Sequence, residues 1–252
     1  IMPGQLHWKA GRLPGKIRLM AGRPALLVFD FDGTLAPIAP TPGQARMPAG
    51  TRAVLRRLSR MKGVSVAIVS GRGLNDLSRK VGLKGITLLG NHGLSCSDYR
   101  LGLEDSRYRS WVRVAAEAAG RLSPLKRLFP GSLIELKGPD VSLHYRLVPA
   151  RKKAELLGSA GRMVKGLELS EKAGKKVIEF RPRTRRNKGW ALIRLARCKA
   201  AGWNRNGFCV YVGDDVTDED AFRAVKRLGT RAFGVKVGGG ATHATIRLGG
   251  QG

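Results

Sequence analysis

Long apolar runs are absent from this sequence, and so are other features that define whole classes of protein. No window holds the roughly eighteen apolar residues that a membrane-spanning helix needs. The first residues also lack the charged, apolar and small-residue order of a signal peptide, so we expect a cytoplasmic protein with no membrane attachment. Cysteine is scarce: Cys96, Cys198 and Cys209 are odd in number and widely spaced, which fits neither a disulfide framework nor a zinc site. We therefore expect thiols in the core.

Acidic residues are also scarce, because 18 Asp and Glu face 47 Lys and Arg, for a formal net charge of +29 and a pI near 11.3. Such a surface attracts polyanions, nucleic acid included, and steers phosphorylated metabolites toward the protein. The bases are spread along the chain, which a general basic bias without any partner also produces. Aromatic residues make up only 6% and no helix-turn-helix or zinc spacing is visible, so the pattern disfavours nucleic-acid binding as the main function.

The length of 252 residues and the 42% hydrophobic content allow one large domain that carries a smaller insertion. Residues 1–24 are rich in Gly, Pro and bases and predict a basic leader or arm. Beyond them, apolar runs typical of buried strands alternate with helical periodicity, which predicts an α/β fold with a doubly wound, Rossmann-like parallel sheet. The predicted strands are 25–29, 64–69, 86–89 and 208–212, and the predicted helices include 51–61 and 74–81.

The middle of the chain has a different pattern. A helix is predicted over 108–122, and strands at 132–137 and 141–148 flank Gly138-Pro139-Asp140 as in a hairpin. A helix over 151–164 and strands at 167–170 and 176–180 follow. We therefore expect an inserted α+β domain over residues 97–180, between the two halves of the sheet domain, 25–96 and 181–252.

Two acidic motifs follow two of the predicted buried strands. Asp30-Phe31-Asp32-Gly33-Thr34 comes after the first strand, and period-two geometry predicts that both carboxylates point the same way. Gly213-Asp214-Asp215 comes after the strand at 208–212. Because the carboxyl ends of parallel strands meet at one edge, these carboxylates would repel one another unless a hard cation bound among them, and oxygen ligands select Mg2+.

This arrangement suits phosphoryl transfer. Asp30 would attack phosphorus and form an aspartyl-phosphate, and Asp32 would act as general acid and then general base. Ser70 and Lys188 would hold the remaining phosphate oxygens. The metal ligands would be Asp30, the backbone carbonyl of Asp32, Asp214 and Asp215. For Asp215 and Asp218, however, capping of the following helix is an equal alternative to metal duty.

The motifs together resemble those of the haloacid dehalogenase-like (HAD) phosphatases and, more narrowly, those of trehalose-6-phosphate phosphatases. The resemblance runs from about residue 25 to about 248 and is carried by the segments Asp30–Thr34, Ser70–Arg72, Gly90–Gly93, His144–Arg146, Glu179–Pro182, Asn187–Gly189 and Gly213–Phe222. It implies that the inserted domain is a cap, and that a sugar phosphate is the small-molecule partner.

The same resemblance implies a set of substrate contacts and a reaction. The contacts are Gly33, Thr34, Gly71, Arg72, Asn91, His92, Arg146, Glu179 and Arg181. The implied reaction is Mg2+-dependent hydrolysis of trehalose 6-phosphate by a protein that we take as a monomer. The alternatives are another sugar phosphate, such as sucrose phosphate, a mannosyl phosphoglycerate or a hexose phosphate, or a basic nucleic-acid-binding protein with secondary phosphatase activity.

Overall fold

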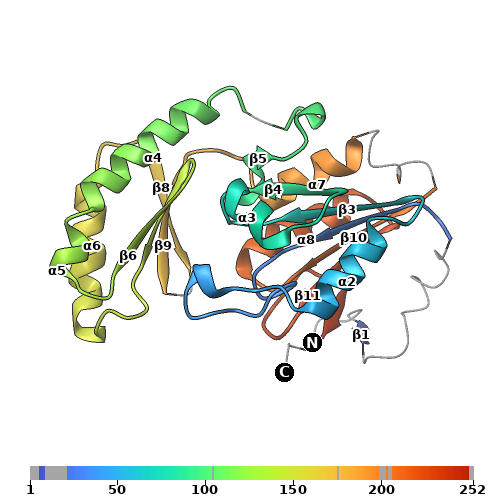
Figure 1. The fold of residues 1–252 in the computed structure, drawn as a ribbon, viewed down its shortest axis with the longest axis horizontal. Helices are drawn as coiled ribbons and strands as arrows, with labels where there is room; N and C mark the ends of the chain where they lie inside the picture. Colours follow the sequence, from blue (N-terminus) through green and yellow to red (C-terminus); the bar gives the residue numbers. More distant parts are fainter. Residues whose placement is uncertain are drawn as a thin grey trace. The chain divides into compact units, whose positions relative to one another are not determined.

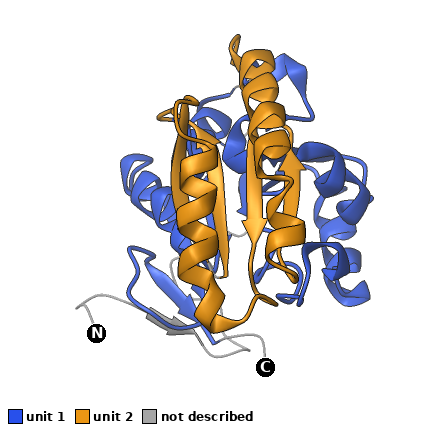
Figure 2. Cartoon of the chain, turned by 90° about the vertical axis from the view of Figure 1, so that its left-hand side faces the viewer, with its two compact units in different colours: residues 1–103, 186–252 blue, residues 104–185 orange. Residues whose placement is uncertain are grey.

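The computed structural model describes the backbone of residues 6–8 and the whole of residues 22–103, 105–174, 176–198, 203 and 206–249. The chain divides into two compact units, which Figure 2 shows in blue and orange. Unit 1 comprises residues 1–103 with 186–252, and unit 2 comprises residues 104–185. The sequence predicts an inserted domain over residues 97–180, and compact unit 2 begins and ends a few residues later, at 104 and 185.

Unit 1 contains an eight-stranded sheet in which the strands near the centre are parallel. Its spatial order is β1 (Leu6–Trp8), β12 (Ile246–Leu248), β11 (Ala232–Val237), β10 (Phe208–Gly213), β2 (Ala25–Phe29), β3 (Val64–Val69), β4 (Ile86–Gly90) and β5 (Ser95–Cys96). Among the described strands of this sheet, only β5 pairs antiparallel, with β4. The parallel α/β core agrees with the sequence prediction.

The apolar runs form central strands because both faces of the sheet are covered. On β2, Leu26 and Val28 join a cluster with α7 (Lys188–Arg197) and α8 (Glu219–Arg227). The other face packs against α2 (Ala49–Leu58) and α3 (Leu74–Val81), where Leu55 and Leu77 are buried. Figure 1 shows these helices around the sheet. Short 3-10 segments complete the unit at η1 (Pro42–Gln44), η2 (Asn91–Gly93), η3 (Tyr99–Leu101) and η6 (Val216–Asp218).

Two sequence predictions within unit 1 can be compared with the structure. Residues 6–8, which belong to the segment predicted as a basic leader or arm, form strand β1 in parallel register with β12, while the rest of 1–21 lies outside the described residues. The thiols are also less buried than expected, since only Cys209 is buried and Cys96 and Cys198 are half-buried. A three-residue edge strand is too short to produce a readable period.

Unit 2 is a four-stranded antiparallel sheet covered by helices on one face. The sheet order is β6 (Leu133–Lys137), β7 (Asp140–His144), β9 (Val177–Pro182) and β8 (Leu169–Gly174), and the other elements are α4 (Tyr108–Leu122), α5 (Leu125–Leu128), η4 (Ala150–Lys152) and α6 (Lys153–Met163). Val141, Leu143 and Phe180 pack with the helices in one core. The predicted strand over 141–148 is too long, because β7 ends at His144 and a turn follows.

Among the helices that the structure describes, none has the length and apolar character required to cross a bilayer.

Candidate active site

Three carboxylates meet at the carboxyl edge of the unit 1 sheet: Asp30 follows β2, Asp214 follows β10, and Asp218 ends the next segment, η6. Strands β2 and β10 pair with Phe29 opposite Val212, so the residues that follow them, Asp30 and Asp214, emerge side by side. One carboxylate oxygen from each of Asp30, Asp214 and Asp218 lies within 4.8 Å of the others. Because Asp30 and Asp218 are buried, their charges are poorly screened by water and require local compensation.

Lys188, the first residue of α7, supplies part of that compensation. Its Nζ donates to Asp30 Oδ1 at 2.7 Å and to Asp218 Oδ1 at 2.8 Å. Asn187 caps the helix through its side chain, which accepts from Trp190 N at 2.9 Å and so fixes where α7 begins. Burial alone would lower the pKa of Lys188, but the carboxylates of Asp218 and Asp30 raise it above its ordinary value. The side chain is therefore held as an ammonium.

Asp218 is the organising acceptor of the cluster. Its Oδ1 accepts from Lys188 and from the Tyr211 hydroxyl at 2.6 Å, and its Oδ2 accepts from the backbone N of Asp214 at 3.0 Å and of Asp215 at 2.9 Å. Although burial opposes the charged form, Lys188 and these donors lower the pKa of Asp218. Four hydrogen bonds use the lone pairs of a carboxylate. Asp218 thus positions the other groups and leaves Asp30 and Asp214 to face an incoming ligand.

Asp214 is held at the edge by its neighbours from three segments. Thr34 Oγ1 donates to Asp214 Oδ1 at 3.1 Å, and the buried Lys236 of β11 donates to the Asp214 backbone carbonyl. Gly33, with φ +86°, lies so close that a Cβ there would be 2.0 Å from Asp214 Oδ2. Burial and the charge of Asp218 raise the pKa of Asp214 to about 6.

This set of oxygens fits a small divalent cation. Burial raises the pKa of Asp30 well above its ordinary value, so the cluster carries its charges at a cost in the absence of a cation. A bound cation would instead favour the ionised carboxylates and so lower their pKa values. Hard carboxylate and carbonyl oxygens are what Mg2+ prefers, and no sulfur or imidazole ligand belongs to this cluster of described residues.

Asp32 has partners different from those of Asp30. Arg72, itself buried, donates through Nε to Asp32 Oδ2 at 2.7 Å and through Nη2 to Oδ1 at 2.6 Å. The third guanidinium nitrogen donates to Asp76 Oδ2 at 2.7 Å, and the group lies 5.4 Å from the centre of the Phe31 ring. Strand β2 ends at Phe29, so Asp30 and Asp32 lie beyond the strand from which the period-two expectation was drawn, and their carboxylates bind different partners.

The segments after β3 and β4 hold each other in place. His92 N donates to Ser70 O and Asn91 N donates to Arg72 O, both at 2.8 Å. Asn91 and His92 adopt positive φ of 51° and 56°, a conformation that costs energy without glycine and is maintained by these bonds. Gly71 leaves room for the His92 ring, since a Cβ would lie 2.6 Å from Nε2. Ser70 is buried, and its Oγ accepts from Arg72 N at 3.2 Å.

The remaining predicted residues lie outside the carboxylate cluster. Asp215 is exposed and its side chain caps η6, where it accepts from Val216 N at 2.7 Å. Arg146, Glu179 and Arg181 belong to unit 2. There Arg146 is exposed after β7, while Glu179 and Arg181 form an ion pair on β9. Burial opposes the charged form of Glu179, but Arg181 and Lys137 lower its pKa.

Sequence reasoning missed three supporting residues: Tyr211, Asp76 and Lys236. Lys236 carried a readable signal, because a single lysine within the apolar strand 232–237 must find a buried acceptor. Tyr211 interrupts the aliphatic run of β10 with a hydroxyl that also needs a partner. Asp76 has no such signal, since acidic residues in the first turn of a helix are common.

Comparisons with known proteins point to one family. The sequence profile of the trehalose-phosphatase family matches residues 28–248. A trehalose-phosphate phosphatase of Mycobacterium avium is 37% identical over 228 residues, which cover 88% of this chain and 56% of the relative. The chain therefore spans little more than half the length of that relative. A crystal structure of a trehalose-6-phosphate phosphatase related protein is 28% identical with a TM-score of 0.73, covering 88% of this chain and 90% of that one.

The C-terminal domain of the Candida albicans trehalose-6-phosphate phosphatase has the same fold, with a TM-score of 0.73, 24% identity, and coverage of 94% of this chain and 92% of that one. The profile match spans both acidic motifs, Ser70 and Lys188. The chain belongs to the trehalose-phosphatase family of the HAD-like superfamily.

Proposed function

We propose that this chain is a Mg2+-dependent phosphatase that hydrolyses trehalose 6-phosphate to trehalose and phosphate. One observation carries the proposal: Asp30 is a buried carboxylate held by Lys188 beside Asp214 and Asp218, at the sheet edge where α/β proteins bind ligands. The site thus combines a nucleophile, Asp30, with the fixed positive charge of Lys188 and a place where a divalent cation can bind. Family membership supplies the substrate class.

In the first step, an oxygen of Asp30 forms a bond to phosphorus while the bond from phosphorus to the sugar oxygen breaks. Lys188 holds Oδ1 of Asp30 at 2.7 Å, which leaves Oδ2 for the attack. Asp32 gives a proton to the departing sugar oxygen. In the second step, Asp32 takes a proton from water as that water attacks phosphorus, and the Asp30 carboxylate is regenerated.

The described geometry requires one rearrangement before this chemistry. Both oxygens of Asp32 accept hydrogen bonds from Arg72, so Asp32 cannot at the same time donate to a leaving oxygen. Arg72 would shift toward Asp76 and the substrate phosphate as Asp32 is released. Asp30, Asp214 and the Asp32 backbone carbonyl would hold Mg2+, which when bound offsets negative charge on the phosphoryl oxygens. Asp215 is exposed and caps η6, so we assign it no direct bond to Mg2+ and only a contact with the groups that hold the ion.

For the remaining predicted contacts, we propose that Ser70, Gly71 and Arg72 bind the phosphate and that the Asn91-His92 segment positions them. In unit 2, Arg146, Glu179 and Arg181 would contact sugar hydroxyls. Their support is that Glu179 stays ionised between Arg181 and Lys137, which makes it a strong acceptor for hydroxyl groups.

The test is phosphate release from trehalose 6-phosphate, sucrose 6-phosphate, glucose 6-phosphate and p-nitrophenyl phosphate, with Mg2+ or with EDTA. We expect kcat/KM for the trehalose ester to exceed that for the other sugar esters by at least about tenfold, or 1.4 kcal/mol of transition-state binding. Equal rates across the panel would refute the substrate assignment. Retention of full activity in EDTA would refute the role of the cation.

Glu179→Gln separates sugar recognition from chemistry. We expect it to raise KM for trehalose 6-phosphate and to leave hydrolysis of p-nitrophenyl phosphate unchanged, because the aryl ester has no sugar hydroxyl to contact. The matched control is Glu171→Gln on β8, an exposed acid on the same sheet. Equal loss on both esters would show that Glu179 supports the fold and not the sugar.

A further inference from the structure

The charges of unit 1 are separated between the two edges of its sheet. Each of α2, α3 and α8 begins after the carboxyl end of a strand and finishes before the next strand, so its last turn lies at the amino edge. All acidic residues of the unit except Asp98 lie in or beside the motifs at the carboxyl edge, Asp76 included through its bond to Arg72. The amino edge is left without compensating acids.

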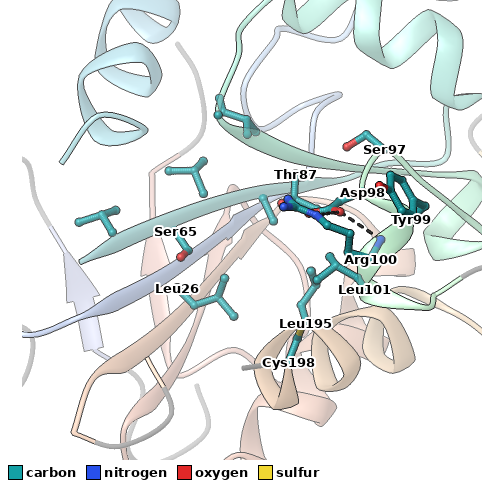
Figure 3. A pocket seen from close by; sticks show the side chains of 15 residues that line it. Leu26, Ser65, Thr87, Ser97, Asp98, Tyr99, Arg100, Leu101, Leu195 and Cys198 are labelled. Atoms are coloured by element: carbon teal, nitrogen blue, oxygen red, sulfur yellow. Dashed lines mark hydrogen bonds and ion pairs between the residues drawn. The ribbon is translucent and has the colours of Figure 1, made fainter. Parts of the chain in front are cut away.

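Asp98 does not supply that compensation, because it is already paired. Its carboxylate accepts from Arg100 Nε and Nη2, both at 2.8 Å. The two residues line a cavity of about 570 Å³ beside the first residues of β3 and β4 (Figure 3). Val64 and Gly85 line this cavity, so it lies close to the amino edge. The ion pair is neutral overall and leaves the positive charge of that edge unchanged.

Bases stand directly before the parallel strands along this edge. Arg23 precedes β2, Arg60 and Lys62 precede β3, Lys84 precedes β4 and Arg231 precedes β11; we call these five residues the basic rim. All are exposed except the half-buried Arg231. Among the described ion pairs, none involves Arg23, Arg60, Lys62 or Lys84. With strands about 4.8 Å apart, the rim extends over roughly 19 Å from β11 to β4.

Compensation of helix dipoles does not account for this charge. The last turns of α2, α3, α7 and α8 each carry two bases, against about half a negative charge at each helix end. The rim residues come in addition to these bases. The amino edge is therefore a strongly positive surface, and it lies at the opposite ends of the strands from Asp30.

We propose that the basic rim binds the phosphate backbone of duplex nucleic acid, without reading its sequence. A row of cations about 19 Å long matches a strand that presents a phosphate every 3.4 Å or so along the helix axis. Stacking on successive single-stranded bases is disfavoured because no aromatic residue adjoins a rim residue in the sequence and a single aromatic side chain, that of Tyr99, lines the neighbouring cavity. An anionic membrane fits less well, since Met61, between Arg60 and Lys62, is the one exposed large apolar side chain that adjoins a rim residue in the described sequence. This binding is independent of the proposed phosphatase function.

The decisive experiment compares two variants of equal net charge. The rim variant replaces Arg23, Arg60, Lys62 and Lys84 by Gln. The control variant replaces four exposed bases of unit 2, Arg113, Lys126, Arg127 and Lys165, by Gln. Anisotropy of a labelled DNA duplex is measured from about 50 to 200 mM salt, over which four phosphate contacts change the affinity by about 100-fold. Circular dichroism and p-nitrophenyl phosphate hydrolysis report whether each variant is folded.

We plot the logarithm of the DNA affinity against the logarithm of the salt concentration. We expect wild type and control to give similar, steep slopes, and the rim variant to give a slope smaller by about 3 to 4 and an affinity at least tenfold weaker. Equal loss in the two variants would overturn the proposal, because it would show that only total charge matters. Absence of wild-type binding at physiological salt would also overturn it. Vesicles containing anionic lipid serve as a third arm, and rim-dependent binding to vesicles without DNA binding would reassign the surface to membranes.

Discussion

Replacing Asp218 by Asn tests the buried network on which the site depends. The substitution removes one negative charge and turns one acceptor atom into a donor. Whichever way the amide lies, its NH2 group faces two donors, either Lys188 Nζ and Tyr211 Oη or the backbone N–H groups of Asp214 and Asp215. Two of four hydrogen bonds are therefore lost, and Lys188 keeps only Asp30 as its anionic partner.

The expected loss of stability is about 3 to 5 kcal/mol, the range observed when one partner of a buried ion pair is removed. Relief of repulsion works against this loss, because the charge of Asp218 raises the pKa of Asp214. We expect the first effect to dominate, since the lost bonds involve a fully buried carboxylate. For a domain of this size, the shift in melting temperature is about 6 to 20 °C.

The assay is urea denaturation followed by circular dichroism, paired with phosphate release. Tyr211→Phe removes a single bond to the same carboxylate and should cost about 1 kcal/mol. Asp220→Asn is the matched surface control, because Asp220 pairs with Arg223 at the exposed side of α8 and should change stability by less than about 0.5 kcal/mol. If Asp218→Asn proved as stable and active as Asp220→Asn, the organising role of Asp218 would be refuted.

Three further predictions concern the cation and the phosphate loops. Because the pKa of Asp214 is raised to about 6, the stability of the protein without a cation should fall as pH rises from about 4 to 6, and Mg2+ should bind poorly below pH 6. Thermal melting with Mg2+ or with EDTA should therefore show a larger stabilisation by Mg2+ at pH 7.5 than at pH 5. Equal stabilisation at the two pH values would contradict the role of Asp214 as a ligand. Gly33→Ala forces a Cβ against Asp214 at φ +86° and should cost at least about 1 to 2 kcal/mol and weaken Mg2+ binding, whereas Gly22→Ala, equally left-handed but in open space, should retain Mg2+ affinity. Arg72→Gln should lower kcat/KM by about 100-fold for the sugar ester and for p-nitrophenyl phosphate alike, because both esters carry the phosphate that Arg72 is proposed to bind and both need Asp32 as base in the second step. Unchanged kcat/KM for both esters would refute this role.

Regular elements with strong periodicity could be predicted from the sequence. The strand over 64–69 and the helices over 74–81 and 108–122 have the predicted bounds, because burial on one or both faces imposes a period on the side chains. Short elements such as β1 and β12 were not predicted, since three residues carry no period and their pairing is decided by distant chain. The strand predicted over 141–148 failed for a related reason, because apolar Leu147 and Val148 continue the pattern into a turn.

In the site, too, the positions of residues at strand ends follow from local sequence, whereas their hydrogen-bond partners come from distant parts of the chain. Motif spacing predicted that Asp30 and Asp214 emerge together, because adjacent parallel strands end at one edge. It did not predict that Asp32 turns to Arg72, since this depends on where β2 ends and on the glycine at position 33. The four bonds of Asp218 also escaped it, because they join residues that lie 3 to 30 positions away in the sequence. Sequence patterns report faces and edges, while hydrogen-bond partners depend on packing.

Detection of a phosphoryl group on Asp30 would test the central claim most directly. The protein is mixed with substrate and Mg2+, quenched in acid and digested, and the peptide containing Asp30 is examined by mass spectrometry. Our account predicts one added phosphoryl group on that peptide in wild type, a larger fraction in Asp32→Asn with an aryl phosphate as substrate, and none in Asp30→Asn. Turnover by Asp30→Asn at the wild-type rate, or a phosphoryl group on another residue, would contradict it.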